Sequence, residues 1–255
     1  LFAAFFNFAA YFLTLAFPPL HKVAETIGAG LIQKELVTPA VIFGALIGAM
    51  FWNVVTWLKG IPCSSSHALV DGLIRSGVAH AGMTGIEWSG LNKTLIAIVL
   101  SPTLGMLLAM LIMLLTSWGF RRATARGADR TFRVLHLVSS AAYSVSHGLN
   151  DAQKTMGIIT VLLYSTGYLH GDFHVPHWVA IACYIAIALG TMTGGWKIIE
   201  TMGSRITKLS QHQGFSASMG GSIVVFTASI LGIPVSTTHT ITGCVIGAGV
   251  AKRAS

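Results

Sequence analysis

The chain has 255 residues, of which 53% are hydrophobic and only 9% are charged, and its formal net charge is +8. Soluble domains carry about 25% charged residues, so this composition excludes an ordinary soluble protein and indicates an all-α polytopic membrane protein embedded in the lipid bilayer. The positive charge does not indicate a nucleic-acid partner, because five arginines lie together in residues 121–133, between two apolar stretches.

Two uncharged stretches of membrane-spanning length open the chain, residues 1–20 and 37–58. A helix needs about 20 apolar residues to cross a bilayer, so we expect both stretches to span it. The second contains the spacing Gly44-x-x-x-Gly48, which allows another helix to approach closely. Because Leu1 already lies inside an apolar run, we expect the natural N-terminus to be missing from this chain.

Residues 60–67 (GIPCSSSH) follow the second span and lead into a segment that contains Asp71 and Arg75. Side chains four residues apart on a helix are neighbours, so we expect these two charges to pair. Residues 94–118 form a long uncharged span, and the basic segment 121–133 comes next. Arginine-rich loops remain on the cytoplasmic side of a membrane, so we place residues 121–133 there.

A polar octapeptide, residues 148–155 (GLNDAQKT), lies between the uncharged runs 134–149 and 155–171. Backbone leaves the helix at bilayer depth only where protein or a water-filled cavity satisfies it, so we predict a broken helix and a binding site here. The glycine would end one half-helix, and Asn150 or Asp151 would cap the next. The alternative is an ordinary loop between two short helices, with Asp151 as a surface cap.

The last part of the chain contains two more apolar stretches, residues 178–196 and 214–251. Three histidines precede them in a segment without Lys or Arg, which suits the outer face, and we interpret them as solvated loop residues rather than metal ligands: His170, His174 and His177. We therefore predict no metal site. Three cysteines have neither metal-ligand spacing nor the even number of a disulfide framework, and we interpret them as small packing residues: Cys63, Cys183 and Cys244.

An internal repeat relates the two halves of the chain. Residues 232–239 (GIPVSTTH) match residues 60–67 at an offset of 172, and each copy follows an apolar span of similar length. We therefore divide the chain into a first repeat of transmembrane helices, residues 1–120, a basic cytoplasmic loop, residues 121–133, and a second repeat, residues 134–255.

The two repeats are predicted to have inverted topology, with broken or re-entrant helices. Counting crossings outward from the basic loop places Gly60 on the cytoplasmic side and Gly232 on the outer side. Inverted repeats are typical of transporters that bind substrate near the midplane, where the halves meet. At the same offset the partner of Asn150 would lie before Leu1, so we expect the first copy of that motif to be missing from this chain.

Proline followed by hydroxyl residues suits the first turn of a helix that binds an anion. Proline is pre-organised for that turn, the hydroxyls and backbone amides are donors, and the helix N-terminus adds a partial positive charge. One Ser or Thr there is often only a cap, but three in each of two copies favour a ligand site. The predicted donors to a tetrahedral oxyanion are Ser64, Ser65, Ser66, Ser236, Thr237 and Thr238, with Asn150 and Gln153 in support.

Charged and titratable residues beside these donors are candidates for the cation and for substrate contacts. We predict that Asp151, together with Asn150, attracts a coupling cation. His67 and His239 follow the triplets and either act on the substrate or make buried structural hydrogen bonds. Lys154 either pairs with Asp151 across one helical turn or meets the anion, and the sequence leaves both open.

In these motifs the chain resembles bacterial members of the inorganic phosphate transporter family, the PiT-type permeases. Residues 147–157 (HGLNDAQKTMG) are similar to the second Asn-Asp motif of that family, and residues 60–67 and 232–239 to its two Pro-x-Ser-Thr-Thr-His motifs. The resemblance implies symport of inorganic phosphate with H⁺ or Na⁺ by a multi-pass homodimer in the cytoplasmic (inner) membrane, with no cofactor. Some bacterial members move a neutral metal-phosphate complex.

Other functions fit parts of the pattern. A passive anion channel needs the same donors but not Asp151, and a transporter of another oxyanion such as sulfate would use the same hydroxyls. An intramembrane hydrolase with Ser66 or Ser236 as nucleophile is disfavoured, because the adjacent histidine would point about 100 degrees away on the helix and no Gly-x-Ser-x-Gly elbow is present. We therefore predict a transporter and not an enzyme.

Overall fold

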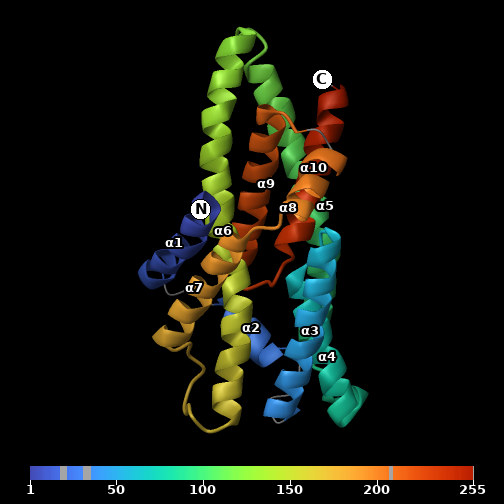
Figure 1. Cartoon of the computed structure of the whole chain (residues 1–255), viewed down its shortest axis with the longest axis vertical. Coiled ribbons are helices and arrows are strands. Elements are labelled where there is room, and N and C mark those ends of the chain that lie inside the picture. Colours follow the sequence, from blue (N-terminus) through green and yellow to red (C-terminus); the bar gives the residue numbers. More distant parts are fainter. Residues whose placement is uncertain (18–21, 31–35, 207–208, 255) are drawn as a thin grey trace.

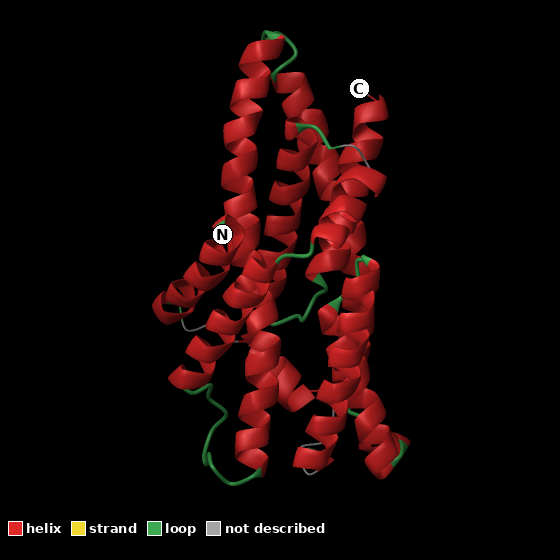
Figure 2. Ribbon diagram, in the orientation of Figure 1, coloured by secondary structure: helices red, strands yellow, loops and turns green. Residues whose placement is uncertain are grey.

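The computed structural model describes residues 1–17, 22–30, 36–206 and 209–254. Every regular element in these residues is helical, as predicted for an all-α membrane protein (Figure 2). The elements in chain order are α1 (Phe2–Ala16), α2 (Lys22–Gly30), α3 (Pro39–Lys59), α4 (Ser65–Ala81), the 3₁₀ turn η3 (Met83–Gly85), α5 (Trp88–Gly119), α6 (Ala125–Ser165), α7 (His177–Thr193), α8 (Trp196–Glu200), the π-helical turn η4 (Thr201–Ile206), α9 (Gln211–Ile230) and α10 (Thr237–Ala254).

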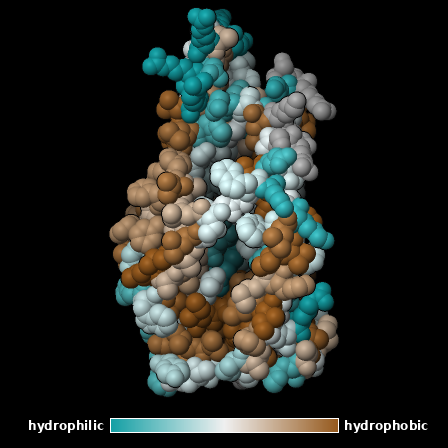
Figure 3. Space-filling view, in the orientation of Figure 1, coloured by the Kyte–Doolittle hydropathy of each residue, from teal (hydrophilic) through white to brown (hydrophobic). Residues whose placement is uncertain are grey.

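Two of the described helices, α3 and α5, have the length and apolar composition of a membrane span, and they coincide with the apolar stretches 37–58 and 94–118. The predicted span 178–196 is instead a bent pair, because α7 ends at Thr193 and the chain continues in a direction that differs by 70°. The first predicted span is shorter than expected within the described residues, since α1 ends at Ala16. Apolar residues cover much of the lower molecule in Figure 3, whereas hydrophilic residues gather at its upper end.

Two helix hairpins enter the molecule from opposite ends and turn back near its middle, α3–α4 from below and α9–α10 from above (Figure 1). Each turn contains a glycine in the left-handed conformation, Gly60 with φ 68° and Gly232 with φ 71°, which costs glycine far less than other residues. The prediction that Gly60 and Gly232 lie on opposite faces of the membrane is therefore wrong. Both hairpins are re-entrant, so both turns lie inside the molecule.

Each hairpin turn is held by a short helical segment from the other half of the chain. The carbonyl oxygen of Gly60 accepts a hydrogen bond from Thr201 Oγ1 at 3.0 Å, and that of Gly232 accepts one from Thr26 Oγ1 at 2.8 Å. A lysine four residues before each threonine packs against the same glycine. The two turns thus have the same surroundings, built from opposite halves, as an internal repeat requires.

α6 is one continuous helix of 41 residues, so the predicted break in residues 148–155 is wrong. At 1.5 Å per residue it is about 60 Å long, which exceeds the thickness of a bilayer core. The helix continues because groups outside α6 pair with the polar side chains of this stretch. No unwound backbone of α6 is therefore needed as their partner. Gly148 allows close packing instead, since a Cβ atom there would lie 2.5 Å from the carbonyl oxygen of Asn7 in α1.

The basic segment predicted as a loop, residues 121–133, is also mostly helical. α6 begins at Ala125, and its N-cap residue Thr124 accepts a hydrogen bond from the amide of Gly127. The later arginines of the segment therefore lie on the first turns of α6, at the upper end of the molecule in Figure 1, while the connection from α6 to α7 lies at the lower end.

Cysteines introduced at Gly127 and Asp172 should react with a membrane-impermeant maleimide from opposite sides of the membrane. Gly127 lies at the arginine-rich end of α6, whereas residues 166–176, which contain Asp172, have no Lys or Arg. Positive charge is retained in the cytoplasm, so Gly127→Cys should label from inside and Asp172→Cys from outside. Labelling of intact cells and inverted vesicles, in a Cys63→Ala background, checks this. Reaction of both cysteines from one side would contradict it.

Close backbone packing between α5 and α10 depends on a glycine pair that the sequence interpretation did not single out, Gly243 and Gly247. A Cβ atom at either position would collide with a backbone carbonyl oxygen of α5. In the pair that was singled out, Gly44 approaches only a side chain of α4, and Gly48 has open space beside it. The expected close approach therefore holds in part for α3, and the stronger example lies in α10.

Replacement of Gly247 by alanine should destabilise the protein, while Gly48→Ala should not. Overpacking a tight contact costs about 1 to 3 kcal/mol, because the α5 backbone must move. At Gly48 the methyl group meets nothing within 4 Å, so alanine should stabilise helix α3 by about 0.5 to 1 kcal/mol. Thermal unfolding of the two detergent-solubilised variants measures this difference, and equal melting temperatures would show that the α5–α10 contact adapts without cost.

Candidate functional site

The first turns of α4 and α10 lie against each other where the two hairpins meet. The rings of His67 and His239, one from each helix, are 4.6 Å apart between centroids. Each helix is capped by the first serine of its triplet: Ser64 Oγ accepts from the amide of His67 at 3.2 Å, and Ser236 Oγ accepts from that of His239 at 3.1 Å. Ser64 and Ser236 are therefore caps, as the simpler interpretation of the triplets requires.

Capping does not exhaust the capacity of these serines to bind an anion. A hydroxyl that accepts a hydrogen bond still has its own hydrogen to donate. Ser66 is in the same state, because its Oγ lies 2.6 Å from Lys154 Nζ, and an ammonium group can only donate. The first backbone amides of each helix likewise have no acceptor inside that helix. The junction of the hairpins thus offers neutral donors, including the hydroxyls of three buried serines.

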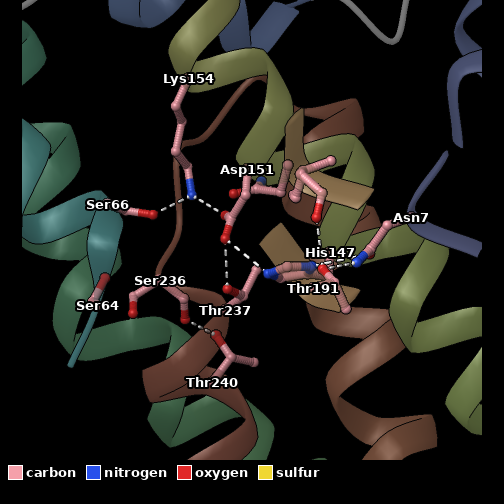
Figure 4. Close-up of polar contacts among 12 residues, drawn as sticks. Asn7, Ser64, Ser66, His147, Asp151, Lys154, Thr191, Ser236, Thr237 and Thr240 are labelled. Carbon is pink, nitrogen blue, oxygen red and sulfur yellow. Dashed lines mark hydrogen bonds and ion pairs between the residues drawn. The ribbon is translucent and has the colours of Figure 1, made fainter. Parts of the chain in front are cut away.

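A buried ion pair on α6 lies beside this junction (Figure 4). Asp151 Oδ1 is 2.6 Å from Lys154 Nζ, and the two side chains are only 13% and 3% exposed. Asp151 Oδ2 accepts a hydrogen bond from Thr237 Oγ1 at 3.0 Å, so the carboxylate connects α6 to the first turn of α10. Of the two possibilities that the sequence left open for Lys154, the structure shows the pairing with Asp151.

Lys154 also contacts both hairpins. Its Nζ donates to Ser66 Oγ in the first turn of α4 and to the carbonyl oxygen of Val235 in the turn before α10, each at 2.6 Å. Taking a charged group out of water is costly unless it is paired and hydrogen-bonded. Three oxygens from α6, α4 and the α9–α10 turn meet that requirement, which explains why a lysine is buried here.

A chain of polar contacts continues from Asp151 toward α1 and α7. His147 Nε2 lies 3.1 Å from Asp151 Oδ2, and His147 Nδ1 lies 3.0 Å from Asn7 Oδ1. Asn7 Nδ2 donates to Thr191 Oγ1 at 2.9 Å. The sequence interpretation missed Asn7 and Thr191. Asn7 did carry a signal, since an amide side chain in an uncharged stretch of spanning length needs a partner within the protein.

Both predicted amide donors of α6 are buried, and one of them contacts α9. Asn150 is fully buried and donates from Nδ2 to Ser229 Oγ of α9 at 3.1 Å, and Gln153 is also fully buried. The Oδ1 atom of Asn150 has no hydrogen-bond partner among the described residues. The structure therefore places Asn150 beside α9 rather than in contact with the hydroxyl triplets, with one amide oxygen left for a ligand.

The remaining predicted donors border the junction. Ser65 is exposed and lines a cavity of about 470 Å³ together with His147, Asp151 and Thr155, among others. Thr238 is half-buried in the first turn of α10. The structure thus brings Ser66, Thr237 and Val235 into direct contact with the Asp151–Lys154 pair, while Ser65 faces the adjoining cavity.

Comparison with known proteins decides the family. A sequence model described as the phosphate transporter family matches residues 1–126 and 120–255. The chain belongs to the phosphate transporter family. Members of this family are transporters rather than enzymes, so the predicted class is confirmed and the hydrolase interpretation is not supported. Membership together with the apolar helices α3 and α5 also establishes a membrane-embedded protein.

Two relatives of the chain are both described as inorganic phosphate transporters. A "Probable low-affinity inorganic phosphate transporter" of Rhizobium meliloti (strain 1021) is 59% identical over 253 residues, which are 99% of this chain and 74% of the relative. A protein of the same name in Bacillus subtilis (strain 168) is 37% identical over 229 residues, covering 87% of this chain and 69% of that one. A solved structure described as "The sodium-dependent phosphate transporter" has the same fold, with a TM-score of 0.83, 23% identity, and coverage of 98% of this chain and 80% of the other.

Proposed function

We propose that the protein transports inorganic phosphate together with a cation, H⁺ or Na⁺, as a multi-pass protein of the cytoplasmic membrane. One observation carries the proposal: the N-termini of α4 and α10, from hairpins that enter from opposite ends, meet beside the buried carboxylate of Asp151. The names of the relatives support phosphate as the substrate, and the sodium dependence named for the solved structure supports a cation as the second solute.

Phosphate is proposed to bind between the first turns of α4 and α10. Burying an oxyanion without hydrogen bonds costs several kcal/mol, and the serine hydroxyls and first-turn amides replace the lost water. Two helix N-termini add partial positive charge, and the nearby ammonium group of Lys154 is balanced by its ion pair with Asp151. Neutral donors bind an anion less tightly than a cluster of arginines would, and release on the far side of the membrane requires this.

The cation is proposed to act through Asp151. An ionised carboxylate is costly at bilayer depth, so its presence there indicates a functional charge rather than a helix cap. Its second oxygen is bonded to Thr237 in the first turn of α10, which is one wall of the proposed anion site. Binding or release of a cation at Asp151 would therefore move the first turn of α10, which forms one side of the proposed phosphate site. A symporter needs such a link between its two solutes.

Uptake of labelled phosphate into proteoliposomes that contain the full-length protein tests the proposal. Accumulation above the outside concentration under an imposed proton or sodium gradient is the expected result, because only coupled transport moves phosphate uphill. Equilibration without accumulation would indicate a passive channel. Competition by excess sulfate equal to that by unlabelled phosphate would indicate a transporter of oxyanions in general.

A further inference from the structure

The ammonium group of Lys154 has the surroundings of a bound cation. Its three ligands are a carboxylate oxygen of Asp151, a hydroxyl oxygen of Ser66 and the carbonyl oxygen of Val235, each at 2.6 Å. They come from three separate elements, α6, α4 and the turn before α10. Carboxylates, hydroxyls and carbonyls of unwound backbone are the oxygens with which transporters coordinate Na⁺ and proteins in general hold hard cations.

We propose that Lys154 is a tethered cation, whose ammonium group occupies the position where a free alkali cation would otherwise balance Asp151. The inference rests on the proposed function and specifies its cation: binding at this position requires no Na⁺, so phosphate uptake does not depend on sodium through the Asp151 site. Lys154 then determines which ion the transporter uses.

The contacts of the ammonium group and its charge both exclude a second cation from this position. An ammonium group has three hydrogens, and the three oxygens engage all of them. The side chain is 3% exposed, so there is little space or water beside it. Like charges a few ångströms apart repel each other, and they repel more strongly inside a protein than in water, so Na⁺ cannot join the ammonium group without displacing it.

Two substitutions of Lys154 remove its charge, but only one of them leaves space for a cation in its place. Lys154→Ala removes the ammonium group and opens its position, leaving His147 and Thr237 as the remaining side-chain contacts of Asp151. Lys154→Met removes the same charge but fills most of the space with an apolar chain. Lys93→Ala, at an exposed lysine of α5, is the matched control for loss of a lysine elsewhere.

The first measurement is the melting temperature of each purified full-length variant in sodium chloride and in choline chloride of equal concentration. Lys154→Ala should be stabilised specifically by sodium, by about 3 to 8 °C at saturation, because an ion that binds only the folded state stabilises it. Wild type, Lys154→Met and Lys93→Ala should show no comparable difference. No sodium effect in Lys154→Ala, or an equal effect in wild type or Lys154→Met, would overturn the inference.

The second measurement is phosphate uptake by the same proteins. Wild type should take up phosphate equally well in sodium and choline media, whereas Lys154→Ala should lose at least about tenfold in choline and recover in sodium. Sodium-dependent uptake by wild type would overturn the inference while leaving the proposed transport intact. Failure of wild type to transport phosphate would overturn the proposed function, and the melting temperatures would still decide whether Lys154 occupies a cation position.

A second variant that leaves the position of the ammonium group unfilled keeps the test decisive if Lys154→Ala does not fold. Lys154→Ser leaves the same space and adds a hydroxyl oxygen toward it. Recovery of folded Lys154→Ser protein in sodium but not in choline would support the inference, since the ion then replaces the missing charge. Aggregation of both open variants in both salts, with Lys154→Met folded, would overturn it.

Discussion

Replacement of Asp151 by asparagine should abolish uphill accumulation of phosphate. The amide can still accept the hydrogen bond from Thr237, so the local geometry is largely retained, but the negative charge beside Lys154 is lost. Removing one partner of a buried ion pair costs about 3 to 5 kcal/mol, because the other charge is left uncompensated. That cost corresponds to a loss of at least about 100-fold in any step that requires the assembled site, measured as initial uptake rate under an imposed gradient.

Asp71→Asn is the matched control for this prediction. Asp71 also pairs with a basic residue on its own helix, Arg75 at 2.7 Å, but both side chains are more than half exposed. Exposed pairs contribute about 0 to 1 kcal/mol, so uptake by Asp71→Asn should be close to that of the wild type. Normal accumulation by Asp151→Asn would show that Asp151 only supports the structure. Equal losses in both variants would point to a general effect of removing acidic residues.

The parts of the site that the sequence predicted are those encoded in short local patterns. Residues 60–67 and 232–239 each combine a glycine for the turn, a proline and a hydroxyl triplet, so one string specifies the turn, the cap and the donors. Helical spacing predicted the pairing of Asp71 with Arg75, and it gave the pairing of Asp151 with Lys154 as one of two possibilities. In each case the interacting groups lie within a few residues of one another.

The parts that the sequence did not predict depend on contacts between distant residues. α6 continues through residues 148–155 because Ser66, Ser229 and Val235 supply partners for its polar side chains, and none of these is near them in sequence. A pattern read along the chain shows a polar interruption but not what satisfies it. The bonding of Thr237 to Asp151 is of the same kind, since it spans 86 residues and requires both hairpins to be in place.

The re-entrant hairpins explain why the counted topology failed. Counting assumed that each apolar stretch crosses the membrane, but α4 and α10 return to the end from which α3 and α9 entered. Hydropathy does not distinguish a full crossing from a return of similar length. The reciprocal contacts of Thr201 with Gly60 and of Thr26 with Gly232 show the relation between the halves directly, because they require the tertiary fold.

Removal of the Ser66 hydroxyl should weaken phosphate binding by about 10- to 150-fold, because a hydrogen bond to a charged group contributes about 1.5 to 3 kcal/mol. Ser66 is suited to this test because it does not cap α4, a role that Ser64 fills. Its Oγ accepts from Lys154 Nζ, so its own hydrogen is available to an anion in the first turn of the helix. Ser66→Ala therefore removes a ligand donor without uncapping the helix.

Ser66→Thr is the matched variant that retains the donor, and it should bind phosphate within a few-fold of the wild type. Threonine is tolerated in the same place of the second repeat, where Thr238 is the counterpart of Ser66 at the offset of 172 residues. Equilibrium binding of labelled phosphate to the purified full-length variants, with melting temperatures to confirm folding, measures both effects. Unchanged binding in Ser66→Ala, or equal losses in the two variants, would mean that Ser66 serves only to pack α4 and hold Lys154, and that the anion binds elsewhere.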